Sequence, residues 1–491
     1  TYQQINKVYH RLCRAVGDYR KALPELMVLD RVQRVASYRS WDNRLIIEKE
    51  AFEICKTLGQ TQAEAALAFL IGHELTHFYQ QHDWGASSGE SGFGTQFLMD
   101  REVFSKQVHH EEEADIYGAF VAHLAGYEVL PIIPKVLDAI YKGYTLDANL
   151  QNYPPLKERK AVAQKVEAKV HELITIYDHA NYFNALGWHV QALASYRYLL
   201  KFVKSKELYN NLGQTLLAMA ILNQEEEDLG LLLPIQIELK HALRDFSFFE
   251  GRKVLLEKAA QSLRKALDFD PNYTRARLNL VCTYLLQGNT HRASLQLRQA
   301  KTEEASTKAQ IQILAALIEA YEGQKRSAVA NLETIKHPNW ESLAKTNIAL
   351  LKGEKVSDKP DSYKGQHPKR EVIGKVGLAV YQAIDLNYQV MLEQNDFWNL
   401  VLDFGEAENC QIAKFELNNH LESTQRLFLL QRSQKAALSQ TSIGMGSTVE
   451  QLKKAYPWAT FRQVAHSNGY FLVSFDKRLI FSISDKQTVV E

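Results

Sequence analysis

Several features that would place a protein in a special class are scarce or absent in this chain of 491 residues. Its four cysteines are far apart and form no C-x-x-C pair, so they are too few for a disulfide scaffold, and we expect buried free thiols. The 58 basic and 57 acidic residues nearly cancel, and no basic block concentrates positive charge, which argues against nucleic acid as a partner. The apolar run at residues 65–71 is far shorter than the ~20 residues that cross a bilayer, so we expect no membrane span.

The length and the changes in composition predict a multidomain, mostly α protein of about three domains. We expect an α+β domain at 1–170, a helical region at 171–352, a polar linker with two prolines at 353–370, and a small strand-rich α+β domain at 371–491. The chain begins with Thr1 rather than Met, so we also expect that an upstream signal peptide or lipid anchor has been removed or left out.

The first domain should begin with a helix at 4–23, followed by strands at 25–29 and 44–48. The second strand is expected to lie immediately before a long helix. In that helix Thr61 should be the N-cap, with Glu64 completing a capping box.

The long helix contains the most informative motif of the chain, His73-Glu74-Leu75-Thr76-His77. The H-E-x-x-H spacing places two imidazoles one turn apart on one helix face, where both can bind one zinc ion. Glu74 would lie beside the bound water and act as general base.

A catalytic zinc site needs a third protein ligand farther along the chain. The metzincin pattern fails, because Gln80 and Asp83 stand where glycine and histidine are required. Glu111 and Asp115 are a better solution, since their i, i+4 spacing puts them on one helix face. Glu111 could then bind the metal while Asp115 orients a histidine ligand.

These motifs resemble the gluzincin metalloproteases that include the CAAX prenyl protease, HtpX and BepA. The shared features are H-E-x-x-H with a further histidine five positions on (His82), E-x-x-x-D (Glu111 and Asp115), and an A-G-Y/F segment (residues 125–127). The motifs cover residues 40–165.

The resemblance implies a zinc endopeptidase with one Zn²⁺ per chain. By analogy His73, His77 and Glu111 are the zinc ligands and Glu74 is the base. The substrate would be a polypeptide, such as a misfolded or envelope protein. The location would be extracytoplasmic, in the bacterial periplasm or cell envelope.

The sequence departs from the family at one position. Family members often have a His-Pro motif after E-x-x-x-D, with an arginine five residues beyond the proline, and here Tyr153 replaces the histidine while Arg159 is kept. A phenol could hydrogen-bond the oxyanion of the tetrahedral intermediate. Alternatively, Tyr153 is a packing residue and Arg159 an ion-pair partner.

Other polar residues near the motif have simpler interpretations. His82 could lie close behind the metal ligands, but a role in capping or packing the helix end fits it better. His109 and His110 do not share a face with the first two histidines, which favours solvated or supporting roles. Residues 85–94, rich in glycine and serine, could be a mobile lid over the cleft or a plain flexible loop.

The region 173–352 should consist of helices of 12 to 16 residues in a repeating order. In the clearest unit a helix ends at residues 270–272, a second helix follows, residues 288–289 form a turn, and a third helix runs through 293–300. This order resembles the tetratricopeptide repeat, and BepA-type members also carry such a tail. Stacked repeats would form an α-solenoid that binds a partner protein. A generic helical bundle is the alternative.

The last domain contains no catalytic constellation. Strands are expected at 389–392, 400–404, 411–417, 426–430, 471–475 and 479–483, with a helix that begins at Ser447 in a capping box with Glu450.

The sequence therefore predicts a zinc-dependent endopeptidase with repeats that bind a substrate or partner. The alternative is a non-catalytic scaffold or chaperone that keeps a zinc-binding, protease-like domain. A structural zinc site has no use for the middle glutamate of the motif, which weighs against that alternative.

Overall fold

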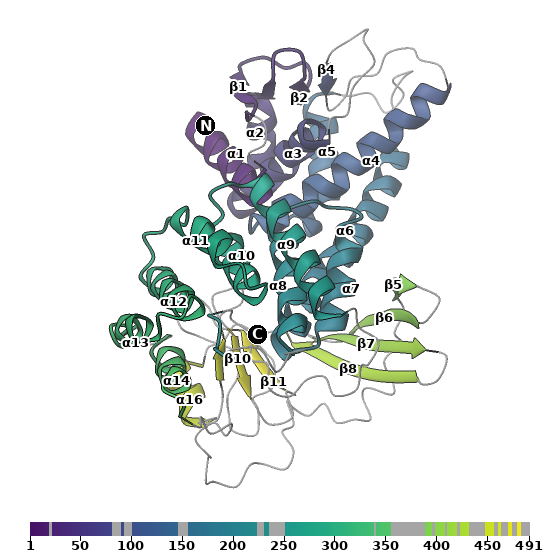
Figure 1. Cartoon of the computed structure of the whole chain (residues 1–491). Coiled ribbons are helices and arrows are strands. Elements are labelled where there is room, and N and C mark those ends of the chain that lie inside the picture. The colour runs from purple at the N-terminus through teal and green to yellow at the C-terminus, as the bar shows by residue number, and fades with distance from the viewer. Residues whose placement is uncertain are drawn as a thin grey trace. The chain divides into compact units, whose positions relative to one another are not determined.

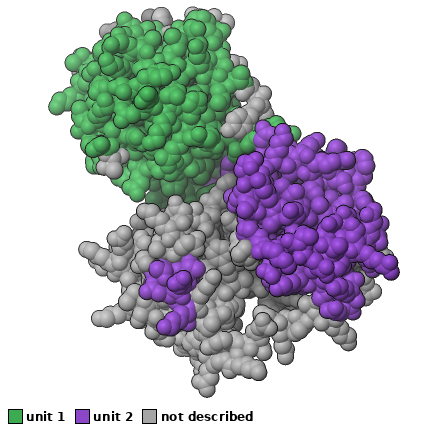
Figure 2. Space-filling view, turned by 90° about the vertical axis from the view of Figure 1, so that its left-hand side faces the viewer, with its two compact units in different colours: residues 1–178, 202–206, 268–271 green, residues 179–201, 207–267, 272–491 purple. Residues whose placement is uncertain are grey.

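The computed structural model shows a mostly helical chain with few strands (Figure 1). It describes residues 1–18, 22–80, 90–92, 101–145, 156–222, 230–234, 251–337, 340–354, 388–394, 398–407, 410–419, 423–431, 447–455, 460–462, 470–473 and 479–482. Two compact units are distinguished, coloured green and purple in Figure 2. Unit 1 comprises residues 1–178, 202–206 and 268–271, and unit 2 the remainder. Among the described residues, no helix has both the length and the apolar character needed to span a bilayer.

Unit 1 combines helices with a small mixed sheet. Its described elements are α1 (Tyr2–Val16), β1 (Glu25–Leu29), β2 (Ala36–Arg39), β3 (Arg44–Glu48), α2 (Lys49–Lys56), α3 (Gln60–Gln80), β4 (Glu90–Gly92), α4 (Arg101–Leu124), η1 (Leu130–Ile132), α5 (Ile133–Gly143) and the first part of α6 (Leu156–Leu186). The strand order is β1-β3-β2-β4, with β1 parallel to β3 and the other pairs antiparallel.

The two strands expected in this unit are present as β1 and β3. The prediction that β3 directly precedes the long helix is wrong, because α2 lies between them. The first helix was also expected to reach residue 23, but α1 ends at Val16. Gly17 follows in the left-handed conformation with φ of 61°, and its N–H bonds the Cys13 carbonyl, which is a common way to end a helix.

The beginning of α3 differs from the expected capping box. The helix starts at Gln60, and the Gly59 carbonyl accepts hydrogen bonds from the N–H groups of Gln62 and Ala63. Thr61 is therefore inside the first turn and is not the N-cap. Gly59 directly precedes the helix and has φ of 110°, a conformation that residues with a side chain rarely adopt. Glycine is therefore favoured at this position.

Unit 2 contains a series of helices. They are the last part of α6, α7 (His189–Leu199), α8 (Lys206–Leu222), α9 (Arg252–Phe269), α10 (Thr274–Leu286), α11 (Thr290–Arg298), α12 (Ala305–Tyr321), α13 (Lys325–Glu333) and α14 (Glu341–Leu351). From α10 to α14 each helix packs against the next one (Figure 1). From α7 on their lengths run from 9 to 18 residues, a wider range than the 12 to 16 expected.

The helix order predicted around residues 266–300 is confirmed. α9 ends at Phe269, just before Asp270-Pro271, and the turn at Gly288, with φ of 70°, separates α10 from α11. The boundary placed at residue 170 falls inside α6, and the division between the units lies farther along the same helix, at residue 178. Of the expected linker, residues 355–370 lie outside the described part of the chain.

The strands of the C-terminal region form two antiparallel sheets. One contains β5 (Tyr388–Gln394), β6 (Trp398–Ala407), β7 (Cys410–Asn419) and β8 (Ser423–Gln431) in that order, and the other contains β9 (Thr460–Arg462), β10 (Tyr470–Val473) and β11 (Leu479–Ser482). The helix α16 (Val449–Ala455) follows a capping box that lies one residue beyond the expected one. Thr448 Oγ1 accepts from the Gln451 N–H, and Gln451 Oε1 accepts from the Thr448 N–H.

Candidate metal centre

The two histidines of the H-E-x-x-H motif lie on α3, a helix that is buried over most of its length. All apolar residues between Ala65 and Leu75 are buried in the core. The polar side chains of His73, Glu74 and His77 are buried as well, with no exposed surface. Buried polar side chains require partners, so each of these three must be satisfied by groups inside unit 1.

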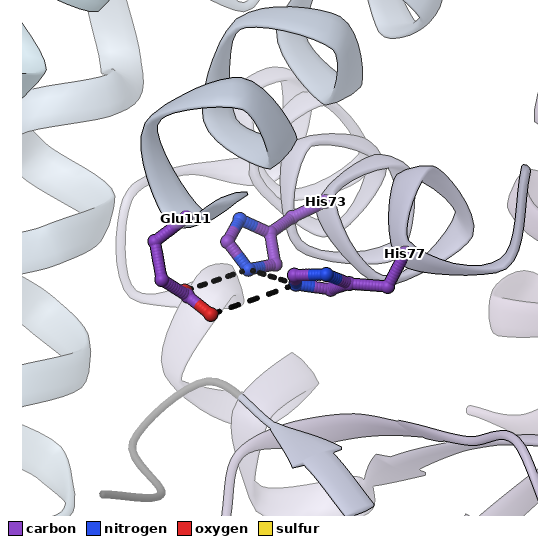
Figure 3. A group of neighbouring side chains, drawn as sticks. All are labelled: His73, His77 and Glu111. Atoms are coloured by element: carbon purple, nitrogen blue, oxygen red, sulfur yellow. Dashed lines mark hydrogen bonds and ion pairs between the residues drawn. The ribbon is translucent and has the colours of Figure 1, made fainter. Parts of the chain in front are cut away.

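Glu111 of α4 meets both histidines, so that the three side chains converge on one point (Figure 3). Glu111 Oε2 lies 3.2 Å from His73 Nε2, and Glu111 Oε1 lies 3.7 Å from His77 Nε2. The two Nε2 atoms are 3.2 Å apart. One donor atom from each residue falls within 4.8 Å of the others, an arrangement compatible with one metal ion.

The distances suit a small tetrahedral ion. Ligand atoms bound at ~2.0 to 2.1 Å around a tetrahedral zinc ion lie roughly 3.3 Å from one another. The two histidine Nε2 atoms are 3.2 Å apart, and each lies 3.2 or 3.7 Å from one of the two Glu111 oxygens, which is close to that value. Two imidazole nitrogens and a carboxylate oxygen are also the donor types that zinc accepts. The residues present therefore fit the group that the sequence predicts.

Asp115 contacts His73 at Nδ1, the ring nitrogen that does not face the other two side chains. Its Oδ1 lies 2.7 Å from His73 Nδ1, and the carboxyl group is buried. A carboxylate in this position favours the tautomer that carries hydrogen on Nδ1, which leaves the Nε2 lone pair directed at the point shared with His77 and Glu111. The structure thus brings together four of the predicted site residues, His73, His77, Glu111 and Asp115.

The charges around His73 favour a cation. Burial alone disfavours the imidazolium form, but the hydrogen bonds and negative charges of Asp115 and Glu111 outweigh burial and raise the pKa of His73 to about 10. The carboxylates therefore stabilise positive charge at this point, which a divalent metal ion would supply in place of the proton.

Glu74 is anchored to the sheet. Its Oε2 accepts a hydrogen bond of 2.8 Å from the backbone N–H of Tyr38 in β2. This contact fixes the orientation of a carboxylate that lies between the two histidines in the sequence. Sequence reasoning missed the role of β2, because no local pattern shows which strand will pass beside a helix 36 residues away.

The A-G-Y segment forms the end of α4. Gly126 has φ of 81°, its N–H bonds the His123 carbonyl, and the Tyr127 N–H bonds the Ala122 carbonyl, which is the pattern of a glycine C-cap. Arg11 of α1 stacks on the Tyr127 ring at 4.4 Å. The segment therefore fixes the helix that carries Glu111, and its contacts are structural.

The remaining candidates are outside this cluster or outside the described residues. Tyr153 and His82 lie in stretches that the structure does not describe, as does the side chain of Arg159, whose backbone is in α6. His110 is described and half-buried, and it does not belong to the three side chains that could hold a metal ion. Within the expected lid at 85–94, residues 90–92 form β4 and pair with β2.

No family model matches this chain, and no curated protein matches it. The resemblance to the gluzincin metalloproteases therefore depends on the sequence motifs alone, and the geometry adds a triad compatible with one metal ion.

Proposed function

We propose that this protein is a zinc-dependent endopeptidase of the gluzincin type. The observation that carries the proposal is the convergence of His73, His77 and Glu111 at distances that suit one zinc ion, with Glu74 in the same buried region of α3. A structural zinc site is closed by four protein ligands, whereas a catalytic site uses three and keeps a position for water or substrate. Among the described residues only three ligands gather here.

In this proposal each residue has a defined role. His73, His77 and Glu111 would hold the ion, and Asp115 would keep His73 in the tautomer that binds. When bound, zinc supplies Lewis acidity toward a water molecule and the scissile carbonyl. Glu74 would take the proton of that water and pass it to the leaving amine. The hydrogen bond from the Tyr38 N–H to Glu74 Oε2 would hold the carboxylate in one orientation during this transfer.

The first test is degradation of an unfolded substrate such as casein by the zinc-loaded chain, followed on a gel with Glu74→Gln alongside. We expect cleavage by the unmutated chain alone, inhibition by a chelator, and zinc retained by Glu74→Gln at one ion per chain. His73→Ala and Glu111→Ala should lose both metal and activity. Cleavage retained by Glu74→Gln would remove the base assignment.

The helices of unit 2 are proposed to form an α-solenoid of tetratricopeptide-like repeats that binds a substrate or partner protein. The successive packing of α10 to α14 supports this interpretation. The rival function is a non-catalytic scaffold or chaperone. A pull-down that needs only residues 173–352, combined with zinc-bound chain that cuts no substrate, would favour it. A place in the bacterial periplasm or cell envelope is proposed from the resemblance alone.

A further inference from the structure

A short apolar segment of unit 2, residues 230–234, is buried without forming a helix or strand. Its sequence is Gly-Leu-Leu-Leu-Pro, and its irregular conformation has local causes. Gly230 has φ of 64°, which favours glycine, and Pro234 disfavours the helical conformation for the residue before it. Leu231 and Leu233 are only 5% and 7% exposed, so the segment is packed inside the protein.

Two helices hold this segment, and both hold it by its main chain. The Leu232 N–H donates to Asn347 Oδ1 of α14 at 2.7 Å, and Asn347 Nδ2 donates to the Leu232 carbonyl at 2.8 Å. Gln310 Nε2 of α12 donates to the Pro234 carbonyl at 2.7 Å. None of these hydrogen bonds depends on the identity of a side chain in the segment.

The pairing between Asn347 and Leu232 resembles the pairing between neighbouring strands. One amide side chain satisfies both polar groups of a single residue, as a strand neighbour would do. Asn347 has no exposed surface, and a buried amide group without hydrogen-bond partners would destabilise the fold. The main chain of Leu232 supplies those partners. Main-chain hydrogen bonds with pockets for alternate side chains are a general mode of binding extended peptides.

We propose that α12 and α14 form a binding site for an extended, leucine-rich segment of another polypeptide, and that residues 230–234 occupy this site as an internal competitor. The chemistry of the occupant defines the partner: apolar side chains at alternate positions and a free N–H at the residue that meets Asn347. The inference rests on the polypeptide-binding part of the proposed function and makes no use of the metal centre.

An internal competitor lowers the apparent affinity of the site for any peptide added from outside. A tethered segment has an effective concentration on the order of millimolar, so a free peptide must displace it before Asn347 becomes available. Weakening the internal segment should therefore strengthen the binding of a peptide added from outside. This opposite response separates a displaceable occupant from an ordinary structural loop.

The test uses the full-length chain carrying Glu74→Gln, so that the probe cannot be cut, and a fluorescein-labelled Gly-Leu-Leu-Leu-Pro peptide with blocked ends. Leu232→Pro removes the N–H group that donates a hydrogen bond to Asn347 Oδ1. In fluorescence anisotropy we expect the Leu232→Pro chain to bind the probe at least tenfold more tightly than its parent. Adding Asn347→Leu should abolish this binding, while the control Gln312→Leu, at an exposed glutamine of α12, should leave it intact.

Equal affinity of parent and Leu232→Pro would overturn the proposal, as would binding that survives Asn347→Leu. If either variant fails to fold, as judged by circular dichroism, hydrogen exchange in the parent decides. Excess peptide should then accelerate exchange of the Leu232 N–H at least tenfold, and an unchanged rate would also overturn the proposal. Failure of casein hydrolysis would leave these binding results unaffected, so the two proposals can fail separately.

Discussion

Gly118 of α4 lies directly against Gly72 of α3, so that the two helices touch backbone to backbone. A β-carbon on Gly118 would come within 2.5 Å of the His73 nitrogen and 2.7 Å of the Gly72 carbonyl carbon. A β-carbon on Gly72 would come within 2.6 Å of the Gly118 carbonyl oxygen. The close approach next to His73 is what allows Glu111 and Asp115, on the preceding turns of α4, to reach the histidines.

Replacing either glycine should therefore damage the metal centre as well as the fold. For Gly118→Ala the clash is with backbone, which cannot rotate away, so we expect a loss of about 1–3 kcal/mol or more in the free energy of unfolding. The metal content should fall in parallel. Urea unfolding and elemental analysis of the purified protein measure the two effects.

The control for this variant is Gly251→Ala. An added β-carbon there meets nothing within 4 Å, and the residue lies at the start of α9, far along the chain. It should change stability by about 1 kcal/mol or less and leave the metal content unchanged. Equal behaviour of the two variants would show that the helix crossing does not set the site.

Asp115 should tune metal affinity without being a ligand. Asp115→Asn keeps the shape of the side chain but removes the charge that holds the Nδ1 hydrogen of His73. Changes of this kind typically weaken metal binding by about 10- to 100-fold. A competition titration with a coloured chelator measures the affinity. Glu112→Gln, a neighbouring loss of charge on α4, should leave it within about twofold; an equal loss in both variants would indicate a general electrostatic effect.

Local spacing was sufficient to predict which side chains of each helix share a face. H-E-x-x-H and E-x-x-x-D both contain an i, i+4 pair, and helix geometry alone places such pairs together. The sequence could not show that α3 and α4 cross at Gly72 and Gly118, because that contact depends on two segments 46 positions apart. The hydrogen bond from the Tyr38 N–H to Glu74 was hidden for the same reason.

In the C-terminal region two overlapping sequence patterns predicted different starts for the same helix. Ser447 with Glu450 and Thr448 with Gln451 both fit the capping pattern, and the reciprocal hydrogen bonds of a capping box are formed by the second pair. Two overlapping signals of equal local strength cannot be separated without knowledge of where the helix packs. Gly17, in contrast, was a usable stop signal for α1 that the helical periodicity of residues 4–23 obscured.

Glu48, at the end of β3, should be a strong stabilising residue of unit 1. Its carboxylate is completely buried and accepts hydrogen bonds from the N–H groups of Gln33 and Arg34 and from Arg31 Nε. Glu48→Gln would place an amide NH₂ among these donors, leaving buried groups unsatisfied at about 1–3 kcal/mol. The shift of the urea midpoint gives the cost.

The matched variant is Glu25→Gln, which breaks the ion pair with Arg44 at the surface. Glu25 is 67% exposed, and an exposed ion pair contributes little because water screens it, so a change of at most about 1 kcal/mol is expected. If Glu48→Gln costs no more than Glu25→Gln, the buried hydrogen bonds of Glu48 are not a source of stability.

The buried thiols should be chemically silent in the folded protein. Cys13, Cys55 and Cys282 are free and buried, as the sequence predicted, and burial raises the pKa of Cys13 to about 11 and that of Cys55 to about 12. Burial also raises the pKa of the Cys282 thiol. Only the thiolate reacts with alkylating agents, and at pH 8 a thiol with a pKa of 11 is ionised at about one part in a thousand.

Treatment with iodoacetamide at pH 8 should therefore add at most one group to the folded chain, at Cys410 in β7, and four groups after unfolding in guanidinium. Intact mass and peptide mapping give the number and the positions. Labelling of each thiol should follow unfolding of the unit that contains it, because each thiol is buried in the core of that unit. Rapid modification of Cys13 in the native protein would instead mean that α1 separates from unit 1 on its own.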